Sequence, residues 1–141
     1  AVEKRVVHLV RRHMFNYDSS WTDAAVRRFI MGAGKENIED LFLLRLADQY
    51  ATRGEKPDPK SLDEFRGRIR KVLSEDSALS LKDLKIRGGD LTQLCGIPPG
   101  PAMGRVLDFL LQAVVDDPAL NEKETLAEMA KRYYSSRLSP P

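Results

Sequence analysis

The chain has 141 residues and a formal net charge of only +2, because 23 Lys and Arg residues stand against 21 Asp and Glu residues. Hydrophobic residues make up 42% and charged residues 31%, proportions that are typical of a globular protein and argue against intrinsic disorder. No apolar run approaches the ~20 residues of a membrane-spanning helix, so we expect no membrane partner.

The amino-acid composition favours helix over strand. Leu and Ala together number 30, against 18 for Val, Ile and Thr, and no segment alternates polar and apolar residues for long. The single cysteine excludes an internal disulfide and favours a reducing, cytoplasmic setting. We therefore predict an all-α fold of about six to eight helices in two small packed units, with no sheet.

The first third of the chain predicts three helices. The start lacks methionine and already follows a helical period from Val2 to Tyr17, so we expect a C-terminal fragment of a larger protein. Thr22 is a suitable N-cap for a second helix, which ends at the glycines of residues 32–34. The third helix covers residues 37–53 and is apolar almost all round.

Residues 54–60 (GEKPDPK) predict a linker, because proline cannot continue a helix. After the linker, Ser61 and Glu64 have the spacing of a capping box at the start of a fourth helix. We therefore divide the chain into residues 1–54 and residues 55–141.

The remaining chain predicts a helical turn at residues 81–84 and three more helices. Their predicted N-terminal residues are Asp90, Pro101 and Asn121. The helix that starts at Pro101 ends before Pro118.

The most distinctive segment is the corner at residues 94–107 (LCGIPPGPAMGRVL), which is typical of a helix-hairpin-helix motif. Glycines let the backbone approach a phosphate, and a helix N-terminus presents free N–H groups. The predicted contacts are the backbone at Gly96, Ile97 and Gly100 and the side chain of Arg105. A tight corner between two helices without any ligand explains the same residues.

Basic residues precede this corner, at Lys82, Lys85 and Arg87. A basic strip beside a glycine-rich turn suits a phosphate backbone, and a solvated helix face is the alternative. Tyr133 and Tyr134 offer a stacking surface, although Tyr133 fits the apolar stripe of the last helix better.

Catalytic patterns are weak in this chain. His13 and Asp48 are candidate metal ligands, and the alternative is a core histidine with an Arg45–Asp48 contact. Cys95 has no histidine near it in the sequence, so we expect it to pack as a small hydrophobic residue. No phosphate-binding loop or closely spaced carboxylate pair is present, so we predict no catalysis by this chain.

Several segments together resemble the bacterial tRNA nucleotidyltransferase and poly(A) polymerase family, in the branch that carries an HD-type domain. Residues 9–15 (LVRRHMF), 21–30 (WTDAAVRRFI) and 40–48 (DLFLLRLAD) resemble its helical HD-type region, to which we assign residues 1–54. Residues 81–91 (LKDLKIRGGDL) and 96–104 (GIPPGPAMG) resemble its RNA-binding tail, to which we assign residues 55–141.

The resemblance implies the C-terminal part of an enzyme that adds CCA or A residues to tRNA 3′ ends. It implies tRNA as a partner, bound by its phosphate backbone, and an N-terminal catalytic head that uses ATP and CTP with Mg²⁺. Nothing in this chain matches that head, so we expect no cofactor here. The alternatives are a fragment of an HD-type metal-dependent phosphohydrolase and a structural helical spacer.

Overall fold

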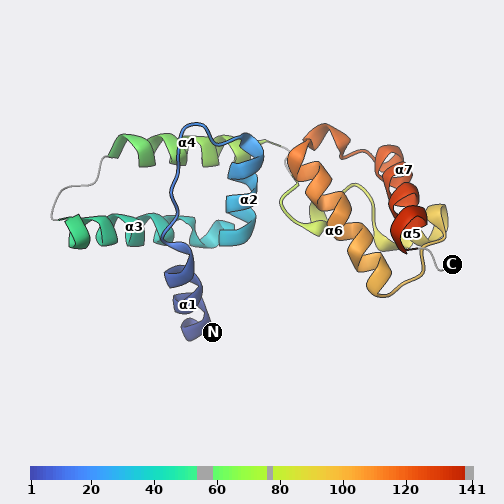
Figure 1. Cartoon of the computed structure of the whole chain (residues 1–141), viewed down its shortest axis with the longest axis horizontal. Coiled ribbons are helices and arrows are strands. Elements are labelled where there is room, and N and C mark those ends of the chain that lie inside the picture. Colours follow the sequence, from blue (N-terminus) through green and yellow to red (C-terminus); the bar gives the residue numbers. More distant parts are fainter. Residues whose placement is uncertain (54–58, 76–77, 139–141) are drawn as a thin grey trace. The chain divides into compact units, whose positions relative to one another are not determined.

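The computed structural model describes residues 1–53, 59–75 and 78–138, whose regular elements are helices, with no strand among them (Figure 1). The predicted all-α class is confirmed. The described helices are α1 (Val2–Arg12), α2 (Asp23–Ala33), α3 (Ile38–Arg53), α4 (Pro59–Ser74), α5 (Gly88–Cys95), α6 (Pro101–Asp116) and α7 (Lys123–Tyr133). Short turns are η1 (Lys35–Asn37), η2 (Leu81–Asp83), η3 (Pro118–Leu120) and η4 (Tyr134–Leu138). None of these described helices is long and apolar enough to cross a bilayer.

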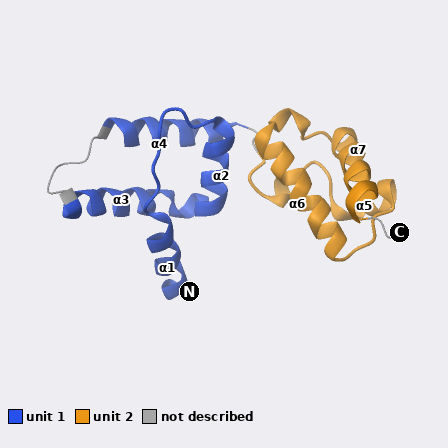
Figure 2. Cartoon of the chain, in the orientation of Figure 1, with its two compact units in different colours: residues 1–75 blue, residues 76–141 orange. Residues whose placement is uncertain are grey.

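The chain divides into two compact units, which we call unit 1 (residues 1–75) and unit 2 (residues 76–141) (Figure 2). The sequence places the boundary between residues 54 and 55, whereas the structure places it after Glu75. The difference arises because α4 packs on α2 and buries Phe65 and Ile69 in unit 1. Most of the predicted linker, residues 54–58, lies outside the described residues.

Unit 1 is organised around the ring of Phe65, which is fully buried on α4. Its ring centroid lies 4.3 Å from that of Tyr17 and 4.9 Å from that of Phe29. Trp21 and Phe42 follow at 5.5 Å and 5.6 Å. Aromatic pairs at such distances add about 0.5–1.5 kcal/mol each beyond the burial of their area.

This ring cluster explains why the first helix is shorter than predicted. The apolar period suggested a helix to Tyr17, but α1 ends at Arg12 and residues 13–22 are not helical. Leaving the helix allows Phe15 and Tyr17 to reach Phe65 on α4. The long-range ring contacts thus outweigh the local helical pattern.

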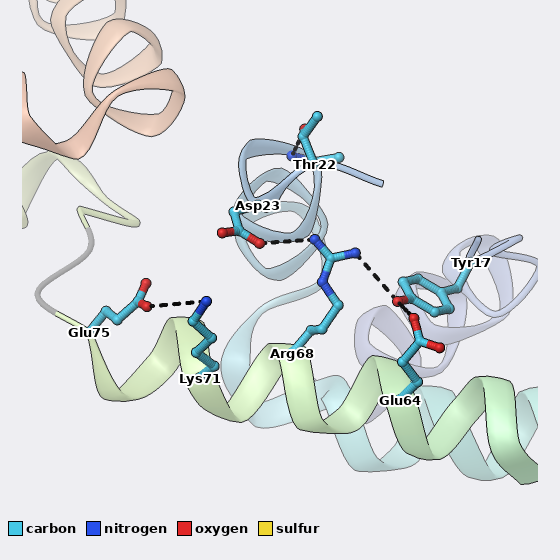
Figure 3. Close-up of polar contacts among 8 residues, drawn as sticks. Tyr17, Thr22, Asp23, Glu64, Arg68, Lys71 and Glu75 are labelled. Carbon is cyan, nitrogen blue, oxygen red and sulfur yellow. Dashed lines mark hydrogen bonds and ion pairs between the residues drawn. The ribbon is translucent and has the colours of Figure 1, made fainter. Parts of the chain in front are cut away.

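A polar network holds the same extended segment against α4 (Figure 3). Arg68 donates to Asp23 Oδ1 at 2.9 Å and to the Tyr17 hydroxyl at 3.4 Å, and that hydroxyl donates to Glu64 Oε1 at 2.6 Å. Burial raises the pKa of Tyr17, whereas the hydrogen bond from Arg68 lowers the pKa of Asp23. Thr22 caps α2 as predicted, since its side chain accepts from the Ala25 N–H at 3.1 Å.

The predicted capping box of α4 is wrong, because the helix already begins at Pro59 and Ser61 lies inside it. Proline suits the first helical position, where its missing N–H costs no hydrogen bond. Pro101 plays this part in α6, as the sequence predicted.

Unit 2 packs α5, α6 and α7 around apolar side chains. Leu91, Ile97, Val106, Leu110 and Leu126 are each 0% exposed. Val106, Leu110 and Leu126 belong to the predicted stripes of α6 and α7, which confirms the helical periods read from the sequence.

The prediction for Asn121 is wrong, because α7 starts after Glu122. Asn121 is buried and links two distant segments instead: its Oδ1 accepts from the Lys85 N–H at 2.9 Å, and its Nδ2 donates to the Asp83 carbonyl at 3.0 Å. The side chain therefore satisfies buried backbone groups of the segment after η2 rather than a helix terminus.

Candidate nucleic-acid interface

The corner between α5 and α6 begins at the C-terminus of α5, where backbone N–H groups of the corner bond carbonyls of that helix. Gly96 takes a left-handed conformation with φ 67° and ends α5. Its N–H donates to the Thr92 carbonyl at 3.1 Å, and the Ile97 N–H donates to the Leu91 carbonyl at 3.4 Å. Because these two hydrogen bonds close the helix terminus, neither N–H points to a ligand, and the predicted phosphate donors Gly96 and Ile97 need correction.

The rest of the corner is open. Residues 98–101 are exposed, and Gly100 has φ 137°, which favours glycine. A Cβ atom built at Gly100 or Gly104 meets nothing within 4 Å among the described residues. In α6, the Gly104 N–H donates to the Gly100 carbonyl in the corner. The backbone at Gly100, directly before α6, is therefore exposed to a large ligand.

The structure brings two of the four predicted cations together. Lys82 and Arg87 line a shallow hollow of about 340 Å³ with Leu107 of α6. Arg87 Nη1 also donates to the carbonyls of Lys82 at 2.9 Å and Leu84 at 3.1 Å, which fixes the guanidinium at the C-terminal end of η2. Arg105 stands two residues before Leu107, about 200° around the helix, so it lies on another face of α6.

The lysines of unit 2 differ in whether a carboxylate neutralises them. Lys85 Nζ pairs with Glu122 at 2.9 Å, Lys123 with Asp90 at 3.1 Å and Lys131 with Glu128 at 3.8 Å. No carboxylate within the described residues pairs with four other cations of this unit: Lys82, Arg105, Arg132 and Arg137. Among the described residues, a carboxylate therefore pairs with the side chain of Lys85 but not with the side chains of Lys82 and Arg87 in the predicted basic strip.

Asp90 was predicted to cap α5, and it acts instead in the first turn of that helix. Its carboxylate accepts from the Arg87 N–H at 2.8 Å and from Lys123 Nζ at 3.1 Å. These contacts lower the pKa of Asp90, the Arg87 hydrogen bond contributing most. Asp90 therefore stays charged and stabilises the start of α5.

Sequence reasoning missed three residues, namely Phe109 on α6, Arg132 on α7 and Arg137 on η4. Phe109, Arg132 and Arg137 line one hollow with Tyr133, whose ring is half-buried rather than part of the core. The sequence did contain one indication of this surface. Arg105 and Phe109 are four residues apart on α6, and residues at this spacing share a helix face.

The candidate metal ligands do lie close together, with His13 Nε2 3.7 Å from Asp48 Oδ1. The other ring nitrogen, Nδ1, contacts the Val10 carbonyl at 2.6 Å. The described part of the chain holds no group of three or more His, Cys, Asp or Glu side chains that would bind a metal. Two ligands do not hold a catalytic metal, so this donor set does not fit one.

The expected alternative contact between Arg45 and Asp48 is also replaced. Arg45 Nη2 donates to Asn16 Oδ1 at 3.0 Å, and its guanidinium lies over the ring of Phe15. Cys95 packs as predicted: it is partly buried, its Sγ lies 3.5 Å from the Ala127 carbonyl, and burial raises the pKa of the thiol. A raised pKa keeps the thiol protonated and unreactive.

Residues 1–130 match a protein family described as tRNA nucleotidyltransferase domain 2. A CC-adding tRNA nucleotidyltransferase of Thermus thermophilus is 33% identical over 126 residues, which cover 89% of this chain and 27% of that protein. An A-adding tRNA nucleotidyltransferase of Deinococcus radiodurans is 35% identical over 115 residues, or 78% of this chain and 25% of that protein. A CCA-adding enzyme of Ligilactobacillus salivarius is 39% identical over 59 residues, or 42% of this chain and 15% of that protein.

The chain therefore spans about a quarter or less of the length of these relatives. No solved structure matches it at comparable significance.

Proposed function

The chain belongs to the tRNA nucleotidyltransferase family, and from this premise we propose that it is a part of a longer enzyme that binds and positions tRNA. The longer enzyme adds CCA or A residues to tRNA 3′ ends, or a poly(A) tail, and this chain holds the phosphate backbone. The contacts depend on charge and shape rather than on base sequence, because such an enzyme serves every tRNA.

The observation that carries this proposal is the group of unneutralised cations in unit 2 beside an open corner. Lys82 and Arg105 have no carboxylate partner among the described residues, and the backbone at Gly100 is exposed. A phosphate that approaches such a cation gains an ion pair and releases counterions without breaking an existing pair. Arg87, fixed beside Lys82, adds a further positive charge to the same hollow.

The names of two relatives support the same assignment. The similar segment occurs in a CC-adding and in an A-adding tRNA nucleotidyltransferase, whose names differ in the nucleotides and agree on tRNA. A segment that both proteins share is expected to serve what they have in common. We infer that the segment binds the RNA and leaves nucleotide choice to another part of the enzyme.

The chemistry belongs to that other part in our proposal. A catalytic head of the same longer chain binds ATP or CTP with Mg²⁺, whereas this chain contributes no catalytic residue. A tRNA partner also assigns the enzyme to the cytoplasm.

The test is a fluorescence-anisotropy titration of labelled tRNA with the 141-residue chain at several salt concentrations. We expect binding that weakens as salt rises, and a slope that falls by about one when Lys82→Ala removes a phosphate contact. Lys85→Ala is the matched control, because this lysine lies three residues away and already pairs with Glu122. Binding that is absent, independent of salt or equally weakened by both variants contradicts the proposal.

A further inference from the structure

Two aromatic rings of unit 2 stack at its surface. The centroids of Phe109 and Tyr133 lie 4.2 Å apart, and the ring planes differ by only 8°. Both side chains are half-buried, and the Tyr133 hydroxyl has no hydrogen-bond partner within the described residues. Because the ring is only half-buried, its hydroxyl is available to solvent or to a ligand.

Tyr133 also contacts an arginine beside the stacked pair. The Arg137 guanidinium carbon lies over the Tyr133 ring at 5.8 Å from its centroid, which is the distance of a cation–π contact. Arg137 is exposed and sits on the single π turn η4, a type of turn that is frequent at functional sites. Since no carboxylate of the described chain holds Arg137, its side chain is free to move over a ligand.

These side chains line a hollow of about 300 Å³, at the lower end of the volumes typical of small-ligand sites. Its walls are Phe109, Met129 and Tyr133, and its polar groups are Arg132, Ser136 and Arg137. No Asp or Glu of the described residues lines it. An apolar stacking surface flanked by two arginines matches a planar base attached to a phosphate.

We infer that this hollow binds one unpaired nucleotide of the RNA, with its base stacked on Tyr133 and its phosphate near Arg132. This inference rests on the proposed tRNA-binding function and adds a second kind of contact to it. Arg105, one helical turn before Phe109 on α6, extends the positive charge from the corner toward the stack. Stacking tolerates any base, so it agrees with an enzyme that serves every tRNA.

The experiment measures stacking and affinity separately in the 141-residue chain. A single-stranded oligoribonucleotide with one 2-aminopurine reports stacking through the quenching of its fluorescence, and labelled tRNA reports affinity. We expect the wild type to quench the probe, Tyr133→Phe to quench it equally, and Tyr133→Leu to lose the quenching. Tyr133→Leu should also weaken tRNA binding about tenfold.

Three controls separate stacking from folding. Tyr50→Leu removes an exposed tyrosine of unit 1 and should leave both readouts unchanged. Arg137→Ala alters only an exposed side chain, so a loss of affinity in this variant does not come from unfolding. Circular dichroism checks that Tyr133→Leu retains the helix content of the wild type.

The outcomes distinguish this inference from the proposed function. If the wild type binds tRNA in a salt-dependent way and Tyr133→Leu binds equally well without any difference in quenching, the hollow is a packing feature or a protein contact, and the inference is overturned. If the wild type quenches the oligonucleotide but does not bind tRNA, the nucleotide site stands and the proposed function is overturned. If neither probe binds, both are overturned.

Discussion

The two units use arginines and aromatic rings in different ways. In unit 1 three arginines lie over rings, namely Arg45 over Phe15, Arg66 over Phe42 and Arg68 over Tyr17. Each of these arginines has a second partner, which is Asn16, Glu39 and Asp23 respectively. In unit 2 the guanidinium of Arg137 lies over Tyr133 and has no further partner in the described residues. An arginine that has a second partner within the chain stabilises the fold, whereas an arginine without one is available to a ligand.

The net charges of the two units, taken alone, would indicate unit 1 rather than unit 2 as the RNA-binding unit. Unit 1 contains 15 Lys and Arg residues against 12 Asp and Glu, whereas unit 2 contains 8 against 9. The proposed RNA-binding unit is therefore slightly acidic overall. Its acidic residues pair with particular lysines and leave other cations without a partner, so the pattern of pairing identifies the binding face where the sum does not.

The largest expected difference is between the effects of replacing two phenylalanines, Phe65 and Phe109, on the stability of unit 1. Phe65→Ala removes the ring at the centre of the unit 1 cluster and should lower the free energy of unfolding by about 3–5 kcal/mol. Denaturant unfolding followed by the fluorescence of Trp21, the one tryptophan of the chain, measures it. Phe109→Ala should leave the Trp21 midpoint unchanged and weaken tRNA binding. Equal losses of unit 1 stability in both variants contradict the distinction between a core ring and a ligand-binding ring.

The next effect concerns the network around Arg68. Arg68→Ala breaks its bonds to Asp23 and Tyr17 and should destabilise unit 1 by about 1 kcal/mol, without altering tRNA affinity. A double-mutant cycle with Asp23→Ala gives the coupling between the two side chains. Additive effects of the two substitutions indicate that the pair contributes nothing to stability.

The same pair makes the stability of unit 1 depend on pH. Arg68 holds the pKa of Asp23 below its ordinary value of 3.8 in the folded chain. A carboxyl with a lower pKa in the folded state adds stability above its unfolded pKa, and this stability is lost as pH falls through the folded pKa. We therefore expect unit 1 to weaken at pH below about 3.8, and Asp23→Asn to weaken less over that range. Parallel acid titrations of Trp21 fluorescence should show the difference; identical curves rule it out.

The smallest expected effect tests whether any exposed arginine binds RNA. Arg11 on α1 lines a hollow that also contains Glu3 and no Phe, Tyr or Trp of the described residues. Arg11→Ala should change tRNA affinity by less than twofold, whereas Arg137→Ala should weaken it severalfold. Anisotropy titrations at one salt concentration compare them. Equal effects mean that charge alone, and not the stack, determines binding.

Much of the fold follows from local signals in the sequence. Thr22, Gly34 and Pro101 mark helix ends through backbone chemistry that acts within a few residues, and α2 and α6 begin and end where these signals indicate. The apolar stripe of α6 likewise predicts Val106 and Leu110 in the core. Such features depend on residues close together in the chain, so the sequence displays them directly.

The errors concern residues whose partners are distant in the sequence. Phe15 leaves the helical pattern for Phe65, fifty residues away in the chain, and Asn121 bridges the Lys85 N–H and the Asp83 carbonyl. The site follows the same rule. Exposed glycines at the corner were predictable, but the neutralisation of Lys85 by Glu122 depends on a contact between segments 37 residues apart.

The most direct test of the account is cross-linking of tRNA to the 141-residue chain, with mass spectrometry to identify the linked peptides. The account predicts salt-sensitive cross-links in unit 2, at the peptides that contain Lys82, Arg105 and Tyr133. Cross-links confined to unit 1, or spread evenly over both units, would contradict it.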